Sequence, residues 1–112
     1  MNQVELNGKG YSIQGDSSGH GISVGNNSNV TIINFANILN FSSGIQLGSA
    51  GANNLVNNVT INTTQGEYGI FIGSDGTVVN NSIIDCNCSG GLNANVAFLA
   101  GSSGATLESN TI

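Results

Sequence analysis

Basic residues are almost absent from this chain of 112 residues, in which Lys9 is the only lysine or arginine and six residues are acidic. Binding to the phosphate backbone of nucleic acids or to anionic lipid needs clustered positive charge, so we expect neither kind of partner. Charged residues of both signs amount to only 6% of the chain, against roughly 25% in typical soluble domains. Neutral Asn, Ser, Thr and Gly residues replace them, and this composition indicates an extracellular or cell-surface protein.

Long apolar runs are absent too, because no stretch approaches the roughly 20 residues that a membrane-spanning helix needs. We therefore expect no insertion into a membrane. The residues after Met1 lack a basic stretch followed by an apolar one, so no signal peptide is expected there. Cysteine is scarce: Cys86 and Cys88 share the chain with a single distant histidine, too few ligands for a typical zinc site. We expect no metal site and no cofactor.

A short phrase recurs along the chain, in which glycine and isoleucine open a run of alternating polar and apolar residues. It begins at Gly21, Gly44 and Gly69, and a weaker copy begins at Ala97. These openings lie 23, 25 and 28 residues apart, a period that suits one turn of a β-solenoid. Glycine suits an opening because a bend often needs positive φ or close approach of another backbone. The pattern predicts an all-β solenoid of about four to five coils with little or no helix.

The repeat makes the chain one β-helix domain of stacked coils. The domain spans 1–112, with a degenerate first coil at 1–20 and repeat coils at 21–43, 44–68, 69–96 and 97–112. Stacked coils lie roughly 4.8 Å apart, so inward residues at equivalent positions should form apolar columns. In the first strand of each coil the expected inward residues are Ile22 and Val24, Ile45 and Leu47, Ile70 and Ile72, and Phe98 and Ala100.

An asparagine follows each opening after a nearly constant interval of 12 to 14 residues. These residues are Asn34, Asn58, Asn81 and Asn110. At one corner of successive coils, each side-chain amide could donate to one neighbour and accept from the other, which would satisfy buried polar groups at a bend. We therefore expect a structural asparagine ladder.

The repeat units resemble the right-handed parallel β-helix repeat proteins of the NosD and pectate-lyase-like superfamily. The resemblance rests on Leu-Asn-Gly-Lys-Gly-Tyr-Ser-Ile-Gln-Gly at 6–15, on the Gly-Ile units and on Asn-Val-Thr-Ile at 29–32, and it covers nearly the whole chain. It implies a right-handed coil. It implies no single activity, because this superfamily includes polysaccharide lyases and hydrolases, phage tailspikes, adhesins and surface proteins.

The segment Gly-His-Gly at 19–21 is similar to a motif of polygalacturonases, in which the histidine lies beside three catalytic aspartates. Here Asp16 is the only carboxylate near His20, whereas glycoside hydrolysis ordinarily uses a pair. The family's uronate-gripping Arg-Ile-Lys corresponds to 44–48 here, which holds no cation, and the arginine base of pectate lyases has no counterpart in a chain without arginine. We therefore expect no enzyme, and a corner position for His20.

Two weaker sites stay open as alternatives. Asp16 with His20 could make a contact with an ion or a sugar, although a third convergent group is missing. Glu67 and Asp75 flank the third opening and could hold a solvated calcium ion, with ordinary surface charge as the simpler interpretation.

Several Asn-x-Ser/Thr sequons occur, many of them a consequence of composition. Those expected in loops, at Asn26, Asn40 and Asn62, are the credible glycosylation sites. Their use would imply a secreted or cell-surface setting.

Strand-like residues begin close to Met1 and continue to Ile112, so we expect terminal coils without caps. Uncapped coils expose unpaired backbone, and a head-to-tail contact between different faces does not close on itself. The sequence therefore predicts a structural solenoid that stacks with copies of itself into a filament or surface layer. The alternative is a carbohydrate-binding or carbohydrate-processing module with glycans as partners, as a piece of a larger surface protein or polysaccharide-active enzyme. Ice binding ranks lower, because Thr31, Thr60 and Thr111 are not expected to share a register.

Overall fold

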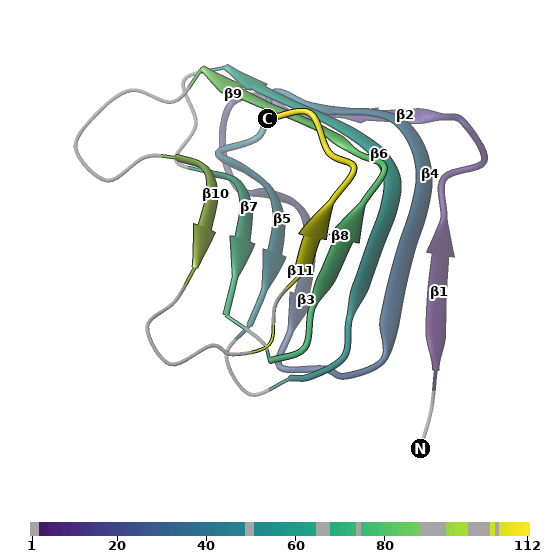
Figure 1. Cartoon of the computed structure of the whole chain (residues 1–112). Coiled ribbons are helices and arrows are strands. Elements are labelled where there is room, and N and C mark those ends of the chain that lie inside the picture. Colours follow the sequence, from purple (N-terminus) through teal and green to yellow (C-terminus); the bar gives the residue numbers. More distant parts are fainter. Residues whose placement is uncertain are drawn as a thin grey trace.

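The computed structural model describes residues 3–48, 51–64, 68–73, 75–87, 94–98, 104 and 106–112. These residues form β-strands and no helix, wound into a parallel β-solenoid of about three turns (Figure 1). The all-β solenoid predicted from the repeats is confirmed.

The described strands belong to two parallel sheets that enclose one core. In chain order the strands are β1 (Val4–Asn7), β2 (Ser12–Gln14), β3 (His20–Gly25), β4 (Val30–Leu39), β5 (Ser43–Leu47), β6 (Leu55–Thr64), β7 (Tyr68–Ile72), β8 (Val78–Asn80), β9 (Ile83–Asn87), β10 (Ala94–Phe98) and β11 (Thr106–Glu108). One sheet has the order β1-β4-β6-β8-β11, with β2 on β4 and β9 on β6, and the other has the order β10-β7-β5-β3. Because β4 and β6 continue around a corner, the first sheet covers two faces and the second covers the remaining face (Figure 1).

The core consists of apolar columns to which each coil contributes one residue. In strand register, the columns are Ile22, Ile45 and Ile70; Leu6, Ile32, Val56, Val79 and Leu107; and Ile13, Ile38, Ile61 and Ile84. The central members, such as Ile45 and Ile61, are 0% exposed. Burial of such a side chain is worth about 1.5–3 kcal/mol, so the columns hold neighbouring coils together.

The opening glycines allow two faces of the solenoid to meet closely. A methyl group added at Gly44 would lie 2.5 Å from Ile61 Cγ2 and 2.7 Å from the carbonyl oxygen of Gly69. Gly21 is confined in the same way, with Ile38 at 2.6 Å. Neither glycine has positive φ, so close approach is the requirement that selects glycine at these openings.

The fourth opening lies two residues earlier than the sequence predicts. Val96 pairs with Ile70 and Ala97 pairs with Phe71, so the residue opposite Gly69 is Asn95 and not Ala97. A shift of two residues leaves every strand side chain on the same face, so the alternating pattern alone cannot distinguish the two registers.

The structure has about three turns, and the strands at the two ends of the stack pair on one side only among the described residues. At the start of the chain, β1 and β2 both pair with β4. In the other sheet β3 is the edge strand among the described residues. Together β1, β2 and β3 give the first turn one strand on each of the three faces, and each of them pairs on one side only among the described residues.

Candidate functional site

Three asparagines of the expected ladder occupy one corner in successive coils. Asn34, Asn58 and Asn81 have left-handed φ of 63°, 56° and 52°. Asparagine tolerates this conformation better than most residues because its short polar side chain can form local hydrogen bonds. Asn58 Nδ2 donates to Asn34 Oδ1 over 2.9 Å, and Asn34 Nδ2 donates to Asn7 Oδ1 over 3.4 Å. These two bonds join the side-chain amides of three coils.

The same corner differs from the prediction in two details. Asn81 Nδ2 donates to Asn57 Oδ1 over 2.9 Å, so the fourth coil joins the preceding coil one residue away from Asn58. The amides also lie at the surface, with Asn58 and Asn81 exposed, whereas the sequence predicts a buried ladder.

Asn110 lies one residue beyond the corner column. Ile83 pairs with Thr111, which sets Ser109 opposite Asn81. Ser109 has the left-handed φ of the corner, 57°. The sequence favours Asn110 by its residue type and interval, whereas a serine holds the corner position in the last coil.

The Asn110 side chain instead binds the backbone of the preceding coil. Its Oδ1 accepts from Ser82 N over 3.0 Å, and its Nδ2 donates to the carbonyl of Val79 over 2.8 Å. Both contacts satisfy backbone groups at a strand end. Asparagine suits this role because its side chain carries both a donor and an acceptor.

Asn54 is a buried structural residue that the sequence interpretation missed. It is 1% exposed, its Oδ1 accepts from Val30 N over 2.9 Å, and its Nδ2 donates to the carbonyl of Asn27 over 3.2 Å. Asn53 directly before it has a left-handed φ of 59°. The Asn-Asn doublet before an apolar strand was the available signal, since it combines a left-handed residue with an amide that reaches the preceding coil.

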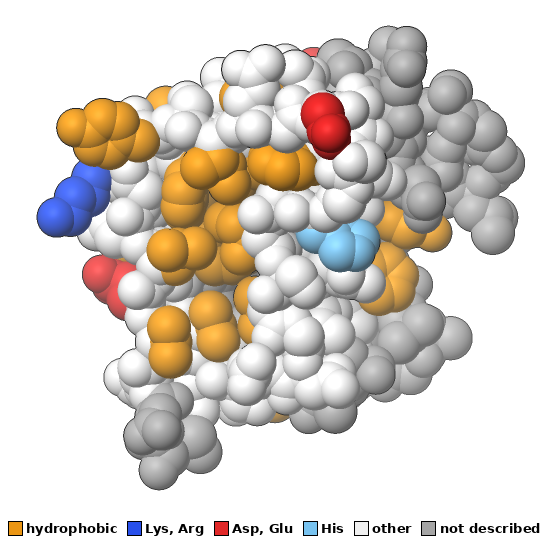
Figure 2. Space-filling model, turned by 180° about the vertical axis from the view of Figure 1, so that it is seen from behind, with side chains coloured by type: hydrophobic (Ala, Val, Ile, Leu, Met, Phe, Trp, Pro, Cys, Tyr) orange, Lys and Arg blue, Asp and Glu red, His pale blue; other side chains and the backbone are white. Residues whose placement is uncertain are grey.

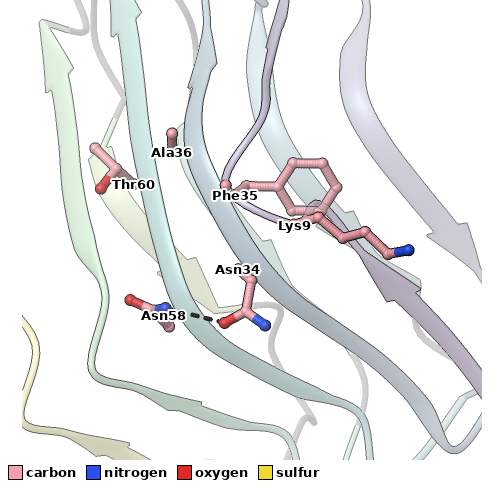
Figure 3. A pocket seen from close by; sticks show the side chains of 7 residues that line it. Lys9, Asn34, Phe35, Ala36, Asn58 and Thr60 are labelled. Atoms are coloured by element: carbon pink, nitrogen blue, oxygen red, sulfur yellow. Dashed lines mark hydrogen bonds between the residues drawn. The ribbon is translucent and has the colours of Figure 1, made fainter.

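A hollow of about 400 Å³, lined by both polar and apolar groups, lies on the outside of this corner (Figure 3). Its lining includes the Asn34 and Asn58 amides, the Thr60 hydroxyl and the Phe35 side chain. Figure 3 shows the Lys9 ammonium directed away from the amide pair. The hollow therefore offers hydrogen-bond donors and acceptors to a neutral polar ligand and contains no carboxylate for acid–base chemistry.

A second hollow, of about 490 Å³, opens the core at the first coil. We call this surface the open end; its apolar lining is Val4, Leu6, Ile22, Val24, Val30 and Ile32. Figure 2 shows hydrophobic side chains gathered in a patch on this side of the molecule. Val4 is 56% exposed and Leu6 is 42% exposed, although both belong to a strand of the core sheet.

His20 and Asp16 are both exposed, and Asp16 bonds to Ser18 and not to His20. His20 is the first residue of β3 and stands opposite Ser43 in the next coil. The Ser18 hydroxyl donates to Asp16 Oδ1 over 2.6 Å, and this hydrogen bond lowers the pKa of Asp16 below its ordinary value. The Asp16 carboxylate is therefore held ionised by its own loop.

The described residues contain no group of three His, Cys, Asp or Glu side chains that could hold a metal ion. Glu67 and Cys88 lie outside the described residues, as does the side chain of Cys86. Asp75 is exposed and stands opposite Ala52 in a single parallel bridge.

Asn26 and Asn40 lie outside the strands, whereas Asn62 lies within β6 and not in a loop as the sequence predicts. Asn26 and Asn62 are exposed, whereas Asn40 is half-buried and has a left-handed φ of 60°. Asn26 and Asn62 are therefore the more accessible acceptors.

No family model, curated protein or solved structure matches this chain. Within the described part of the chain, no helix is long and apolar enough to cross a bilayer.

Proposed function

We propose that this chain is a non-catalytic, extracellular structural β-solenoid that associates end to end with further copies of itself into a filament or surface layer. The observation that carries the proposal is the open end, where Val4 and Leu6 are exposed beside a hollow in the core. An exposed edge strand with apolar inward positions is a template for pairing with another strand.

The opposite end offers a matching surface. β11 is the last strand of its sheet among the described residues, and its inward residue Leu107 is 37% exposed. Ile112, which lies opposite Ile84 when the Ile83 and Thr111 pairing is continued, is 60% exposed. Each end therefore exposes apolar side chains that a neighbouring coil would cover.

The sparse charge and the chemistry of the walls favour a structural role outside the cell. A chain with 6% charged residues has few charges to repel a stacked neighbour, and its exposed amides keep the sides hydrated. The Gly-Ile and Asn-Val-Thr-Ile units support placement among the right-handed parallel β-helix repeat proteins of the NosD and pectate-lyase-like superfamily. The non-catalytic assignment rests on Asp16, which is bonded to Ser18 and not to His20.

Sedimentation velocity across a wide range of protein concentration, with negative-stain microscopy of the same samples, tests the proposal. We expect species that grow with concentration and elongated particles as wide as one solenoid. Monodisperse monomers at every concentration would contradict the proposed association. Ala36→Asp provides a control at about 150 mM salt, where repulsion between distant charges is largely screened, because Ala36 is exposed on the wall and an added charge there should then leave association unchanged.

The hollow beside Asn34 and Asn58 favours a second candidate function, the binding of a neutral glycan. Its amides and the Thr60 hydroxyl are the groups that hydrogen-bond sugar hydroxyls. A glycan array probed with wild type and with Thr60→Val tests it: binding that the variant loses supports this function, and silence of the wild type rejects it.

A further inference from the structure

We infer, on the basis of the proposed end-to-end association, that copies stack head to tail in one register, with β11 of one copy paired in parallel with β1 of the next copy. In this register Leu107 lies beside Leu6 of the neighbouring copy. The inference names the contact, its direction and the residues that determine it.

The apolar column through both edge strands supports this register. Strand pairing aligns Leu6 with Ile32 in the first coils, and Val79 with Leu107 in the last. The middle members are fully buried, whereas Leu6 is 42% exposed and Leu107 is 37% exposed. A neighbouring copy in the same register would cover both terminal leucines and continue the column without a change of spacing.

A second apolar column, through β2, β4, β6 and β9, leads to the same register. It runs from Ile13, which packs against the core and is half-buried, through Ile38, Ile61 and Ile84. Ile112 follows opposite Ile84 and is 60% exposed. Stacking β11 on β1 therefore brings Ile112 beside Ile13 while it brings Leu107 beside Leu6.

Charge and hydrogen bonding are compatible with this register. Glu5 would stand opposite Thr106, and Glu108 would stand opposite Asn7, so no two carboxylates face each other directly. The corner amides donate toward the first coil, from Asn58 to Asn34 and then to Asn7. In the same direction, the Nδ2 group of Asn7 would donate a hydrogen bond to the carboxylate of Glu108 in the neighbouring copy.

Contact between like ends would give a poorer fit. Two open ends related by a twofold axis would bring two hollows of about 490 Å³ together and pair β1 with β1 in antiparallel fashion, whereas every described pair in the solenoid is parallel. Such a contact also joins only two copies, so it forms a closed dimer and cannot extend into a filament.

Mixing two single variants tests the head-to-tail contact. Leu6→Asp places a charge at the open end and leaves the β11 end intact, and Leu107→Asp does the reverse. Because an unpaired charge is costly to bury, we expect each variant alone to associate at least about tenfold more weakly than wild type. An equimolar mixture should form dimers and stop there, because each dimer joins the one intact pair of ends.

The other outcomes separate the two proposals. If wild type is a monomer, the proposed function fails. If wild type assembles but Leu107→Asp alone assembles as well as wild type, end-to-end association stands and the head-to-tail contact is overturned. If both variants alone assemble as well as wild type, contacts lie on the walls and both proposals fail. Circular dichroism of each variant, with Ala36→Asp as the charge control, establishes that the chains are folded.

A cross-link tests the register itself and does not depend on the aspartate variants. Facing residues of paired strands lie close enough for a disulfide. A mixture of Asn7→Cys and Glu108→Cys chains should form a covalent dimer on mild oxidation, joined between the substituted positions in peptide mass spectrometry. Linkage through Cys86 or Cys88 only, in chains that still assemble, would overturn the register.

Discussion

Asn58 donates from its Nδ2 to Asn34 Oδ1 over 2.9 Å, and both residues hold left-handed φ, at 56° and 63°. One residue type thus meets two requirements at the corner, a backbone conformation that most side chains avoid and a hydrogen bond between coils. The two contributions can be separated by substitution.

Asn58→Ala should lose both contributions, and Asn58→Gly should lose only the hydrogen bond. Left-handed backbone costs a residue with a Cβ about 1–2 kcal/mol, and an exposed hydrogen bond contributes about 0.5–1.5 kcal/mol. We expect the free energy of unfolding to fall by about 2 kcal/mol for alanine and about 1 kcal/mol for glycine in urea titrations. Equal losses for the two variants would contradict the account of the corner.

Gly44→Ala should destabilise the fold through overpacking. The added methyl would lie 2.5 Å from Ile61 Cγ2 and 2.7 Å from a backbone oxygen that cannot move independently. We expect a loss of about 1–3 kcal/mol in thermal or urea unfolding. Gly19→Ala is the comparison: nothing lies within 4 Å of a methyl there, but φ is +69°, so only backbone strain of about 1 kcal/mol applies. A smaller loss at Gly44 than at Gly19 would refute the close-approach argument.

Ile45→Ala should be among the most damaging core substitutions, because Ile45 is 0% exposed between Ile22 and Ile70. Removal of a fully buried isoleucine side chain typically costs about 2–5 kcal/mol. Ile22→Ala, at the open end, should cost clearly less because Ile22 is half-buried. Denaturant midpoints measured on monomeric protein provide the test, and comparable losses would contradict the greater exposure of Ile22.

Association should strengthen with salt. The chain carries a net charge of −5, so stacked copies repel one another until ions screen them. Raising the ionic strength from about 20 mM to about 150 mM shortens the Debye length to about 8 Å, and sedimentation should then show larger species. Lys9→Glu should weaken association at low salt, and Lys9→Arg should leave it unchanged. Dissociation of the wild type by salt would show that attraction between charges holds the copies together.

The fold could be predicted from the sequence because its coils repeat the same pattern, a glycine followed by an isoleucine of the core. Gly21, Gly44 and Gly69 each precede an isoleucine of one column, and their spacing gave the period of the solenoid. The prediction failed at Ala97 because strand alternation has a period of two and loops between coils vary in length. Only the strand pairing distinguishes Asn95 from Ala97 as the residue opposite Gly69.

The corner was partly predictable for a related reason. Asn34 and Asn58 are marked by a regular interval and by a residue type suited to left-handed φ. Ser109 holds the same position in the last coil without that residue type, so sequence reasoning passed over it. Asn54 was missed because its importance comes from burial and from two backbone partners in another coil, neither of which has a local signature.

The aligned left-handed corner makes each coil an exchangeable unit. Asn34 and Asn58 have the same backbone conformation and stand at the same place in neighbouring coils. A chain that lacked residues 35–58 would pass from Asn34 directly to Val59, with one coil fewer and the inward columns still continuous. The length of such a protein can therefore change in whole coils, by duplication or loss of a short gene segment, while the cross-section of the solenoid stays the same.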